Sequence, residues 1–352
     1  MLRHTDTPPS DPVCRVLALD GGGAKGFYTL GVLKELEALV GRRIWESFDV
    51  IFGTSTGGII AALLGLGYSV EEVHALYREH VPALMRRWTK RGRSKALAEL
   101  TRTVFEDKTF SAFRTRVGIV ATRWDFERPM IFKSHVDQVH GRKATFEPGF
   151  GCTVADAVCA SCSAYPFFER PILRTGAGDQ VELLDGGYCA NNPTLYAIAD
   201  ATTALGYPSP ALRVVSIGVG RYPEPKRKGL SRVYNRLAIV QLLQKTLDIN
   251  TASMERLREI LFNGICTVRI NDTFEQPEMA TDLMEHDLNK LNMLYQRGSE
   301  SFAKYETELA AIWDIARDLS LPRINGRVSD RPYAASSTCI SYAAGLRYPN
   351  VE

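Results

Sequence analysis

Near the start of the chain, a short apolar run is followed by a segment with apolar residues at helical spacing, and this order occurs twice. Each occurrence predicts a strand followed by a helix. The short apolar runs at 15–19 and 50–52 are typical of buried strands. Residues 26–40 carry apolar side chains every three or four positions, and residues 56–66 are also mostly apolar, so both segments are predicted to be helical. This order favours parallel strand pairing with helices on the sheet faces, which is an α/β fold.

The remaining chain extends this pattern with further short apolar runs and longer helical stretches. Proline, glycine and capping residues mark several of the boundaries between them, as at Asn192-Pro193. The predicted strands lie at 117–122, 130–133, 181–184 and 212–219, and the predicted helical regions at 71–108, 154–161, 192–205 and most of 236–317.

No linker or internal repeat interrupts these elements, so one continuous domain is predicted. It spans 15–317, with a core of strands and helices at about 15–220 and a mainly helical region at about 236–317. Residues 1–14 are polar and proline-bearing and are predicted to be a disordered lead-in. Residues 318–352 form a tail with no assigned structure.

Composition narrows the classes of protein that this chain can represent. A formal net charge of +3 is too small to favour binding of a DNA or RNA polymer. No run approaches the roughly 18 apolar residues that would suggest a membrane-spanning helix. The seven cysteines are an odd number and no secretory signal is visible, so a cytoplasmic location is expected.

Candidate chemistry lies where the first two predicted strands end. The first strand runs into the glycine loop Asp20-Gly-Gly-Gly-Ala-Lys-Gly26, and the second into Gly53-Thr-Ser-Thr-Gly57. A G-x-S-x-G turn between a strand and a helix is the signature of a nucleophile elbow, which predicts Ser55 as a nucleophile. The backbone N–H groups of Gly21, Gly22 and Gly23 could stabilise the oxyanion that forms when a serine attacks an ester.

The glycine loop also fits the dinucleotide-binding fingerprint, Gly21-x-Gly23-x-x-Gly26. That fingerprint requires an acidic residue at the end of the second strand, whereas Asp49 precedes this strand. A phosphate-binding P-loop is excluded because Gly26, and not Ser or Thr, follows Lys25. Dinucleotide binding is therefore the less favoured hypothesis.

A serine nucleophile needs a base at neutral pH, and histidine is the usual choice. Among six histidines, His286 alone would fit the order Ser–Asp–His, but it lies in a polar stretch with no strand end to position it. Asp185 follows the predicted strand 181–184 and precedes two glycines. If this strand is parallel to its neighbours, Asp185 lies at the same sheet edge as Ser55, and we predict that it is the general base.

The glycine loop, the serine elbow and Asp185-Gly-Gly187 occur in the order typical of patatin-like phospholipases, which this chain resembles over about 15–220. The segment 160–167 also resembles the small-residue helix of that family. The resemblance implies a three-layer α/β/α fold with a mainly parallel central sheet and helical C-terminal additions. It implies hydrolysis of lipid acyl esters by a Ser55–Asp185 dyad, with no metal or catalytic cofactor.

Segments 23–34, 121–133, 188–196 and 238–250 resemble the bacterial phospholipase effectors of cyclic-oligonucleotide (CBASS) antiphage signalling. That resemblance implies activation by a cyclic dinucleotide such as cGAMP, supplied by a partner nucleotidyltransferase. The active enzyme would then degrade membrane phospholipids at the inner membrane surface, and a homo-oligomer on activation is compatible with this scheme. Spacing identifies no nucleotide pocket, and the candidate contacts are Arg123, Trp124, Arg128 and Lys133.

Two other functions remain open at this stage. A constitutive patatin-like acyl hydrolase would need no second messenger, and a non-catalytic dinucleotide-binding protein would use only the glycine loop. The basic run at 86–93 is interpreted as a solvated helix end in preference to a contact with a phosphate-bearing ligand or a membrane.

Overall fold

Eight strands form the sheet of the computed structural model, which describes residues 13–141, 143–225 and 231–315. The strand order is β5-β6-β3-β2-β1-β7-β8, and β4 pairs with β3 as an additional neighbour. The strand bounds are β1 Cys14–Leu19, β2 Val50–Thr54, β3 Arg116–Arg123, β4 Arg128–Lys133, β5 Ile172–Arg174, β6 Gln180–Asp185, β7 Leu212–Ile217 and β8 Cys266–Ile270.

The centre of this sheet is parallel and one side is antiparallel. β3, β2, β1, β7 and β8 run in the same direction, so their carboxyl ends meet at one edge, called here the carboxyl edge. β4 and β6 both pair with β3 in the antiparallel sense, and β5 pairs with β6 in the same way.

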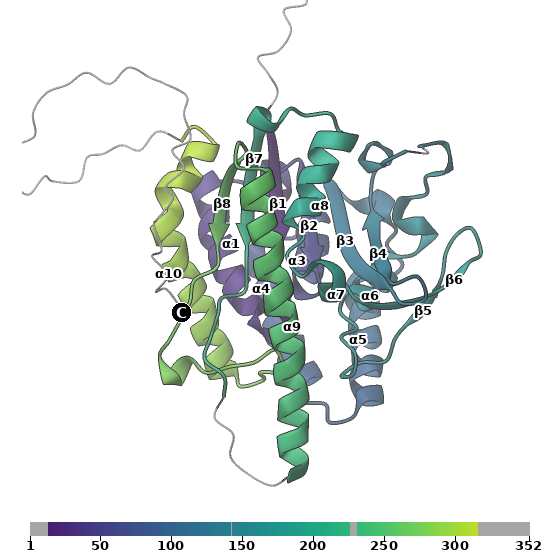
Figure 1. Cartoon of the computed structure of the whole chain (residues 1–352), viewed down its shortest axis with the longest axis vertical. Helices are drawn as coiled ribbons and strands as arrows, with labels where there is room; N and C mark the ends of the chain where they lie inside the picture. Colours follow the sequence, from purple (N-terminus) through teal and green to yellow (C-terminus); the bar gives the residue numbers. More distant parts are fainter. Residues whose placement is uncertain (1–12, 142, 226–230, 316–352) are drawn as a thin grey trace, which may run out of the picture. The chain divides into compact units, whose positions relative to one another are not determined.

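Helices cover both faces of the sheet because successive strand residues point to opposite sides. Leu17 and Ile51 belong to one buried cluster, which also includes apolar residues of α1, α3, α4 and α10. Val16 and Val50 belong to a second cluster with residues of α8. Figure 1 shows α8 and α9 in front of the sheet, with α1 and α4 behind it. The predicted α/β/α layering is therefore confirmed.

The longer helices have the following bounds: α1 Gly26–Val40, α3 Thr56–Gly65, α4 Val70–Met85, α5 Lys90–Phe105, α6 Val154–Ser161, α8 Thr194–Ala199, α9 Ser231–Leu261 and α10 Leu288–Ile312. The short helices α2 and α7 span Ile44–Ser47 and Gly187–Ala190.

Most predicted elements are present, and the differences have local causes. The predicted helix at 71–108 is two helices, because the backbone becomes extended at Thr89, whose side chain caps α5. The predicted helix at 192–205 begins at Thr194, and the Asn192 side chain accepts the Thr194 N–H at 3.0 Å.

Two strands were missed by the sequence-based prediction. β5 has only three residues, none of them buried, so no apolar run indicates it. β8 interrupts the region predicted as mostly helical at 236–317, and it has only two buried residues because it lies at the sheet edge.

The described residues lie in one compact unit that ends at Ile315. Of the predicted lead-in 1–14, only residues 13 and 14 are described, and Cys14 already belongs to β1. The predicted tail at 318–352 lies outside the described residues. None of the helices in the described part of the chain combines the length and the hydropathy needed to cross a membrane.

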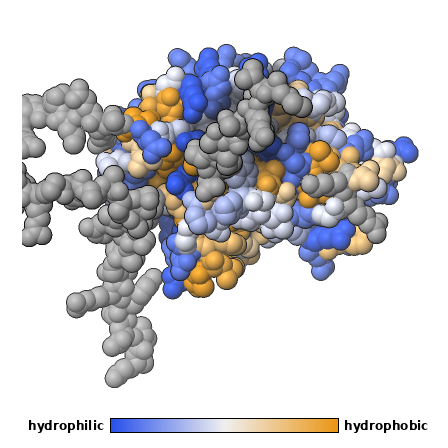
Figure 2. Space-filling model, turned by 90° about the horizontal axis from the view of Figure 1, so that it is seen from above, coloured by the Kyte–Doolittle hydropathy of each residue, from blue (hydrophilic) through white to orange (hydrophobic). Residues whose placement is uncertain are grey.

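Figure 2 shows the side of the molecule where β1 begins, which is opposite the carboxyl edge. Hydrophobic residues occur there in several separate areas among hydrophilic ones.

Candidate active site

Ser55 lies on a strained turn between β2 and α3. Its backbone φ is 53° and its ψ is −122°, which is a conformation that residues other than glycine rarely adopt. Such strain is typical of a nucleophile elbow, because the sharp bend presents the serine hydroxyl at the carboxyl edge. The side chain is 9% exposed.

The two glycines of the elbow are required because backbones approach closely there. A Cβ atom on Gly53 would lie 2.1 Å from the Gly57 carbonyl oxygen. A Cβ atom on Gly57 would lie 2.2 Å from the Leu19 carbonyl oxygen at the end of β1. Strand, turn and helix therefore fit together only without side chains at these positions.

Replacing Gly57 with alanine is expected to destabilise the fold by about 2 kcal/mol or more, because backbone atoms must shift to admit the methyl group. Thermal unfolding measures this effect. Gly264→Ala is the matched control, since its Cβ would have no neighbour within 4 Å. Equal melting temperatures for the two variants would contradict the steric account.

Asp185 lies directly beside the serine. The Ser55 Oγ–H donates to Asp185 Oδ2 at 2.6 Å, and the Gly187 backbone N–H donates to Oδ1 at 2.7 Å. Both carboxylate oxygens are thus fixed, and one of them faces the hydroxyl proton. The structure brings together the two residues that the sequence predicted as a dyad, which are 130 positions apart.

The predicted parallel direction of the strand that ends at Asp185 is wrong. β6 is antiparallel to β3, so Asp185 does not end a parallel strand. β6 enters from beyond the carboxyl edge and ends with Asp185 opposite Ala121, one residue past the pairing of Thr54 with Val120. Asp185 consequently reaches the level of Ser55 from the opposite strand direction.

Burial controls the protonation of Asp185. Removal from water raises its pKa to about 6, and the hydrogen bonds from Ser55 and Gly187 oppose that rise only in part. A carboxylate with this pKa is ionised at neutral pH and is a stronger base than an exposed aspartate.

Two serines that were not among the predicted site residues help to hold Ser55 and Asp185 in place. Ser161 Oγ accepts the Ser55 backbone N–H at 2.8 Å and donates to the Val120 carbonyl at 2.6 Å. The Ser163 carbonyl accepts the Asp185 backbone N–H at 3.1 Å. Both serines belong to the segment 160–167 that carried part of the family resemblance, which was the available signal.

The glycine loop lies against Ser55. A Cβ atom on Gly21 would be 3.2 Å from the Ser55 Cβ. The Gly21 N–H already donates to the Asn191 carbonyl at 3.0 Å. The amides of Gly22 and Gly23 have no hydrogen-bond partner among the described residues, so they are free to donate to a bound group.

Neither of these two glycines leaves room for a side chain. A Cβ on Gly22 would lie 2.5 Å from a Val219 methyl carbon. Gly23 has φ +59°, and a Cβ there would lie 2.3 Å from the Leu283 carbonyl oxygen. The loop is thus packed from both sides, which keeps its amide groups in position.

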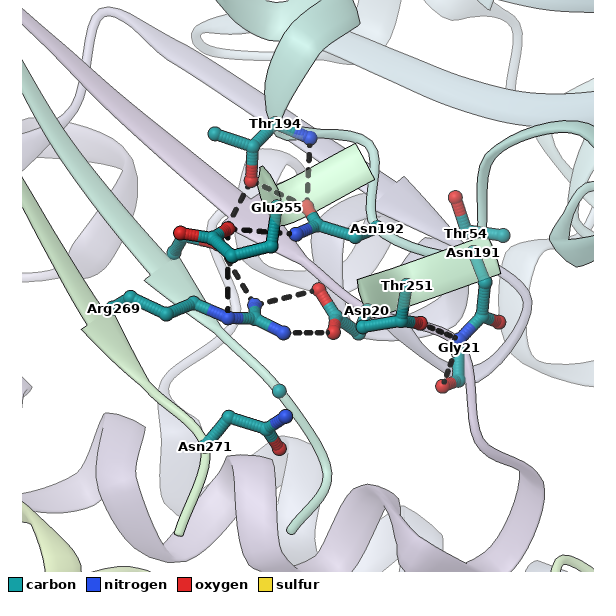
Figure 3. Close-up of polar contacts among 12 residues, drawn as sticks. Asp20, Gly21, Thr54, Asn191, Asn192, Thr194, Thr251, Glu255, Arg269 and Asn271 are labelled. Carbon is teal, nitrogen blue, oxygen red and sulfur yellow. Dashed lines mark hydrogen bonds and ion pairs between the residues drawn. The ribbon is translucent and has the colours of Figure 1, made fainter. Parts of the chain in front are cut away.

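A polar network holds the start of the loop, as Figure 3 shows. Arg269 on β8 pairs with Asp20 through two contacts of 2.9 Å and 2.5 Å, and its Nη1 also donates to Ser216 Oγ at 2.8 Å. Glu255 on α9 lies 3.9 Å from Arg269 Nε and accepts from Asn192 at 3.2 Å. Asp20 and Arg269 are both at least 85% buried, so each charge depends on the other.

The same network connects α9 to Gly21 through Asn191 (Figure 3). The Asn191 side-chain amide donates to the Gly21 carbonyl at 3.2 Å and to Thr251 Oγ1 at 2.8 Å. Its backbone N–H donates to Asn250 Oδ1 at 2.9 Å. The helix α9 therefore helps to position the glycine loop, a role that sequence spacing did not indicate.

Other candidate residues lie elsewhere. His286 is exposed, and its ring contacts the Met284 carbonyl at 3.4 Å. Asp49 precedes β2 and accepts the Arg15 N–H at 2.8 Å, so it does not face the glycine loop.

The four candidate nucleotide contacts do not form one pocket. Lys133 pairs with the buried Asp200 at 2.5 Å, whereas Arg123, Trp124 and Arg128 lie at the exposed turn between β3 and β4.

The fold and the geometry of the site are those of a serine hydrolase with a patatin-like architecture. The family model for patatin-like phospholipases matches residues 17–198, which is just over half of the chain. The chain therefore belongs to the patatin-like phospholipase family and is a lipid ester hydrolase.

Similar proteins include two bacterial enzymes. A cUMP-AMP-activated phospholipase of Escherichia coli is 63% identical over 300 residues, covering 85% of this chain and 94% of that protein. A cGAMP-activated phospholipase of Pseudomonas aeruginosa is 30% identical over 305 residues, covering 82% and 88%. Among solved structures, VipD from Legionella pneumophila matches with a TM-score of 0.44 and 12% identity, covering 85% of this chain and 67% of that one.

Proposed function

We propose that Ser55 and Asp185 hydrolyse acyl esters of membrane phospholipids through a covalent acyl-enzyme. The hydrogen bond of 2.6 Å between Ser55 Oγ and Asp185 Oδ2, on a strained elbow, is the observation that carries this proposal. Asp185 accepts the hydroxyl proton as Oγ attacks the ester carbonyl, and it then returns the proton to the departing alcohol. Water releases the fatty acid in a second step, with Asp185 again as the base.

The amides of Gly22 and Gly23 donate to the oxyanion in both steps. Their lack of other partners supports this role, as does the position of the loop next to Ser55. This assignment is narrower than the prediction from sequence, which also included Gly21. The catalytic domain of the proposal is the predicted span 15–317.

The enzyme is proposed to be regulated by a cyclic dinucleotide from a partner nucleotidyltransferase. The 63% identical relative is named for cUMP-AMP, so cUMP-AMP replaces the cGAMP of the sequence-based prediction as the preferred activator. In this scheme the active enzyme damages phospholipids at the inner membrane surface during antiphage defence. A homo-oligomer on activation stays a prediction.

Addition of cUMP-AMP is expected to raise hydrolysis of a fluorogenic phospholipid by about tenfold or more, with cGAMP giving a smaller effect at equal concentration. Initial rates with each nucleotide, and with none, measure this directly. The Ser55→Ala variant provides the background rate. Full activity without any nucleotide would favour the constitutive hydrolase and would contradict the regulated scheme.

A further inference from the structure

Four aromatic side chains are exposed in segments around the active site, and they are called here the aromatic strip. Trp88 is 75% exposed, Phe126 56%, Trp124 48% and Tyr165 45%. Trp88 lies in the segment between α4 and α5. Trp124 and Phe126 lie in the turn between β3 and β4, and Tyr165 follows α6. Large aromatic rings in water are unfavourable for a free protein, so a cluster of them suggests a binding surface.

Basic side chains lie over three of these rings, and one of them, Arg170, is close to two rings. The Lys90 Nζ is 4.7 Å from the centre of the Tyr165 ring. The Arg170 guanidinium is 4.6 Å from the Trp124 ring and 5.7 Å from the Tyr165 ring. Arg128 lies 4.9 Å from the Phe126 ring. Three of the four rings, those of Tyr165, Trp124 and Phe126, therefore each have a cation close to them.

Positive charge is concentrated at one end of the strip. At the turn after β3, Arg123 pairs with Asp125 and Arg170 with Glu182, each at 2.9 Å, and Glu127 is exposed beside them. The run at 86–93 adds several basic residues and no acidic one. Of that run Arg93 is buried and donates to the Phe167 carbonyl at 3.0 Å, so it fixes the strip from inside.

The strip is attached to the strand and loop that carry Asp185. The Trp124 backbone N–H donates to the Glu182 carbonyl of β6 at 2.8 Å, three residues before Asp185. Tyr165 is two residues after Ser163, whose carbonyl holds the Asp185 N–H, and its own carbonyl accepts the Tyr188 hydroxyl. A surface that contacts the aromatic strip is thus close to the dyad.

We propose that the aromatic strip docks the enzyme onto an anionic phospholipid bilayer. The inference rests on the proposed function, in which the substrate is a membrane phospholipid. Trp and Tyr rings prefer the boundary between headgroups and acyl chains, and nearby cations are attracted to anionic lipids. In this proposal the basic run at 86–93 contacts the membrane, which was the less favoured of its two interpretations from sequence.

The test compares two double variants in the Ser55→Ala background, so that lipid is not consumed. Trp88→Ala/Phe126→Ala removes the two most exposed rings of the strip, neither of which is among the candidate nucleotide contacts. Ile260→Ala/Leu261→Ala is the matched control, because these residues are 57% and 64% exposed but lie at the end of α9, just before β8 begins, away from the carboxyl edge. Cosedimentation is measured with phosphatidylcholine vesicles that contain phosphatidylglycerol, and with pure phosphatidylcholine vesicles, each with and without cUMP-AMP.

The Ser55→Ala protein with an intact strip is expected to bind the anionic vesicles at least about tenfold more tightly than the strip variant does. The control variant is expected to bind as tightly as the protein with the intact strip. Binding to pure phosphatidylcholine is expected to be weaker. Equal binding by both double variants, an equal loss in both, or no vesicle binding at all would overturn the docking proposal. Circular dichroism and thermal unfolding establish that each variant is folded.

A soluble substrate separates this proposal from the function on which it rests. With Ser55 restored, the strip variant is expected to hydrolyse monomeric p-nitrophenyl butyrate at the normal rate and vesicle phospholipid more slowly. Normal hydrolysis of both substrates would overturn docking and leave the hydrolase intact. If the enzyme with an intact strip hydrolyses neither substrate, with or without cUMP-AMP, the proposed function itself fails.

Discussion

Replacement of Ser55 with alanine is expected to lower phospholipid hydrolysis by at least about a thousandfold, because no acyl-enzyme can form without Oγ. The substitution removes one hydroxyl from a side chain that is 9% exposed, and the hydrogen bond from the Ser55 backbone N–H to Ser161 remains. Release of fatty acid from fluorogenic phospholipid, with cUMP-AMP present, is the measurement.

Ser163→Ala is the matched control for this experiment. Its hydroxyl donates to the Cys159 carbonyl at 2.7 Å, whereas its own carbonyl supports Asp185 and survives the change. We expect this variant to retain most of the activity. Hydrolysis by the Ser55→Ala protein at a comparable rate would exclude Ser55 as the nucleophile.

Replacement of Asp185 with asparagine is expected to reduce kcat/KM by at least about a hundredfold, because an amide oxygen cannot take the serine proton. The enzyme with Asp185 should lose activity as the pH falls through about 6, where burial places the pKa of this carboxyl and protonation removes the base. The pH profile of kcat/KM measures that midpoint. A midpoint near the ordinary aspartate value of about 4 would contradict the raised pKa of Asp185.

Stability should change in the opposite direction to activity. The folded protein raises the pKa of Asp185 from 3.8 to about 6, so between these values it binds more protons than the unfolded chain does. Ionisation therefore makes folding less favourable as the pH rises through this window, and the full cost is present above it. The asparagine variant is expected to melt about 2 °C or more higher at neutral pH, and this gain should disappear below about pH 4.

The elements that the sequence predicts well are those with regular patterns. β1, α1 and β2 each have an uninterrupted apolar pattern. The G-x-S-x-G motif specifies the turn at Ser55 because the close backbone packing there leaves no room for side chains at Gly53 and Gly57. β5 and β8 lie at sheet edges and bury few side chains, so their residues have no clear apolar run.

Residues that act from distant elements could not be predicted by pattern alone. Asp185 was predicted from its glycines and its apolar strand, but the antiparallel direction of β6 depends on tertiary pairing. The link from Arg269 to Asp20 spans 249 positions, and that from Thr251 to Asn191 spans 60. The exposure of Trp124 and Tyr165 likewise follows only from the packing around them.

Covalent labelling with a fluorophosphonate tests the central claim most directly. The account predicts one adduct, located by peptide mass spectrometry on Ser55, that is absent from the Ser55→Ala protein. It also predicts that labelling slows in the Asp185→Asn protein and as the pH falls below about 6. An adduct on another residue, or unchanged labelling of the Ser55→Ala protein in the presence of cUMP-AMP, would contradict the Ser55–Asp185 dyad.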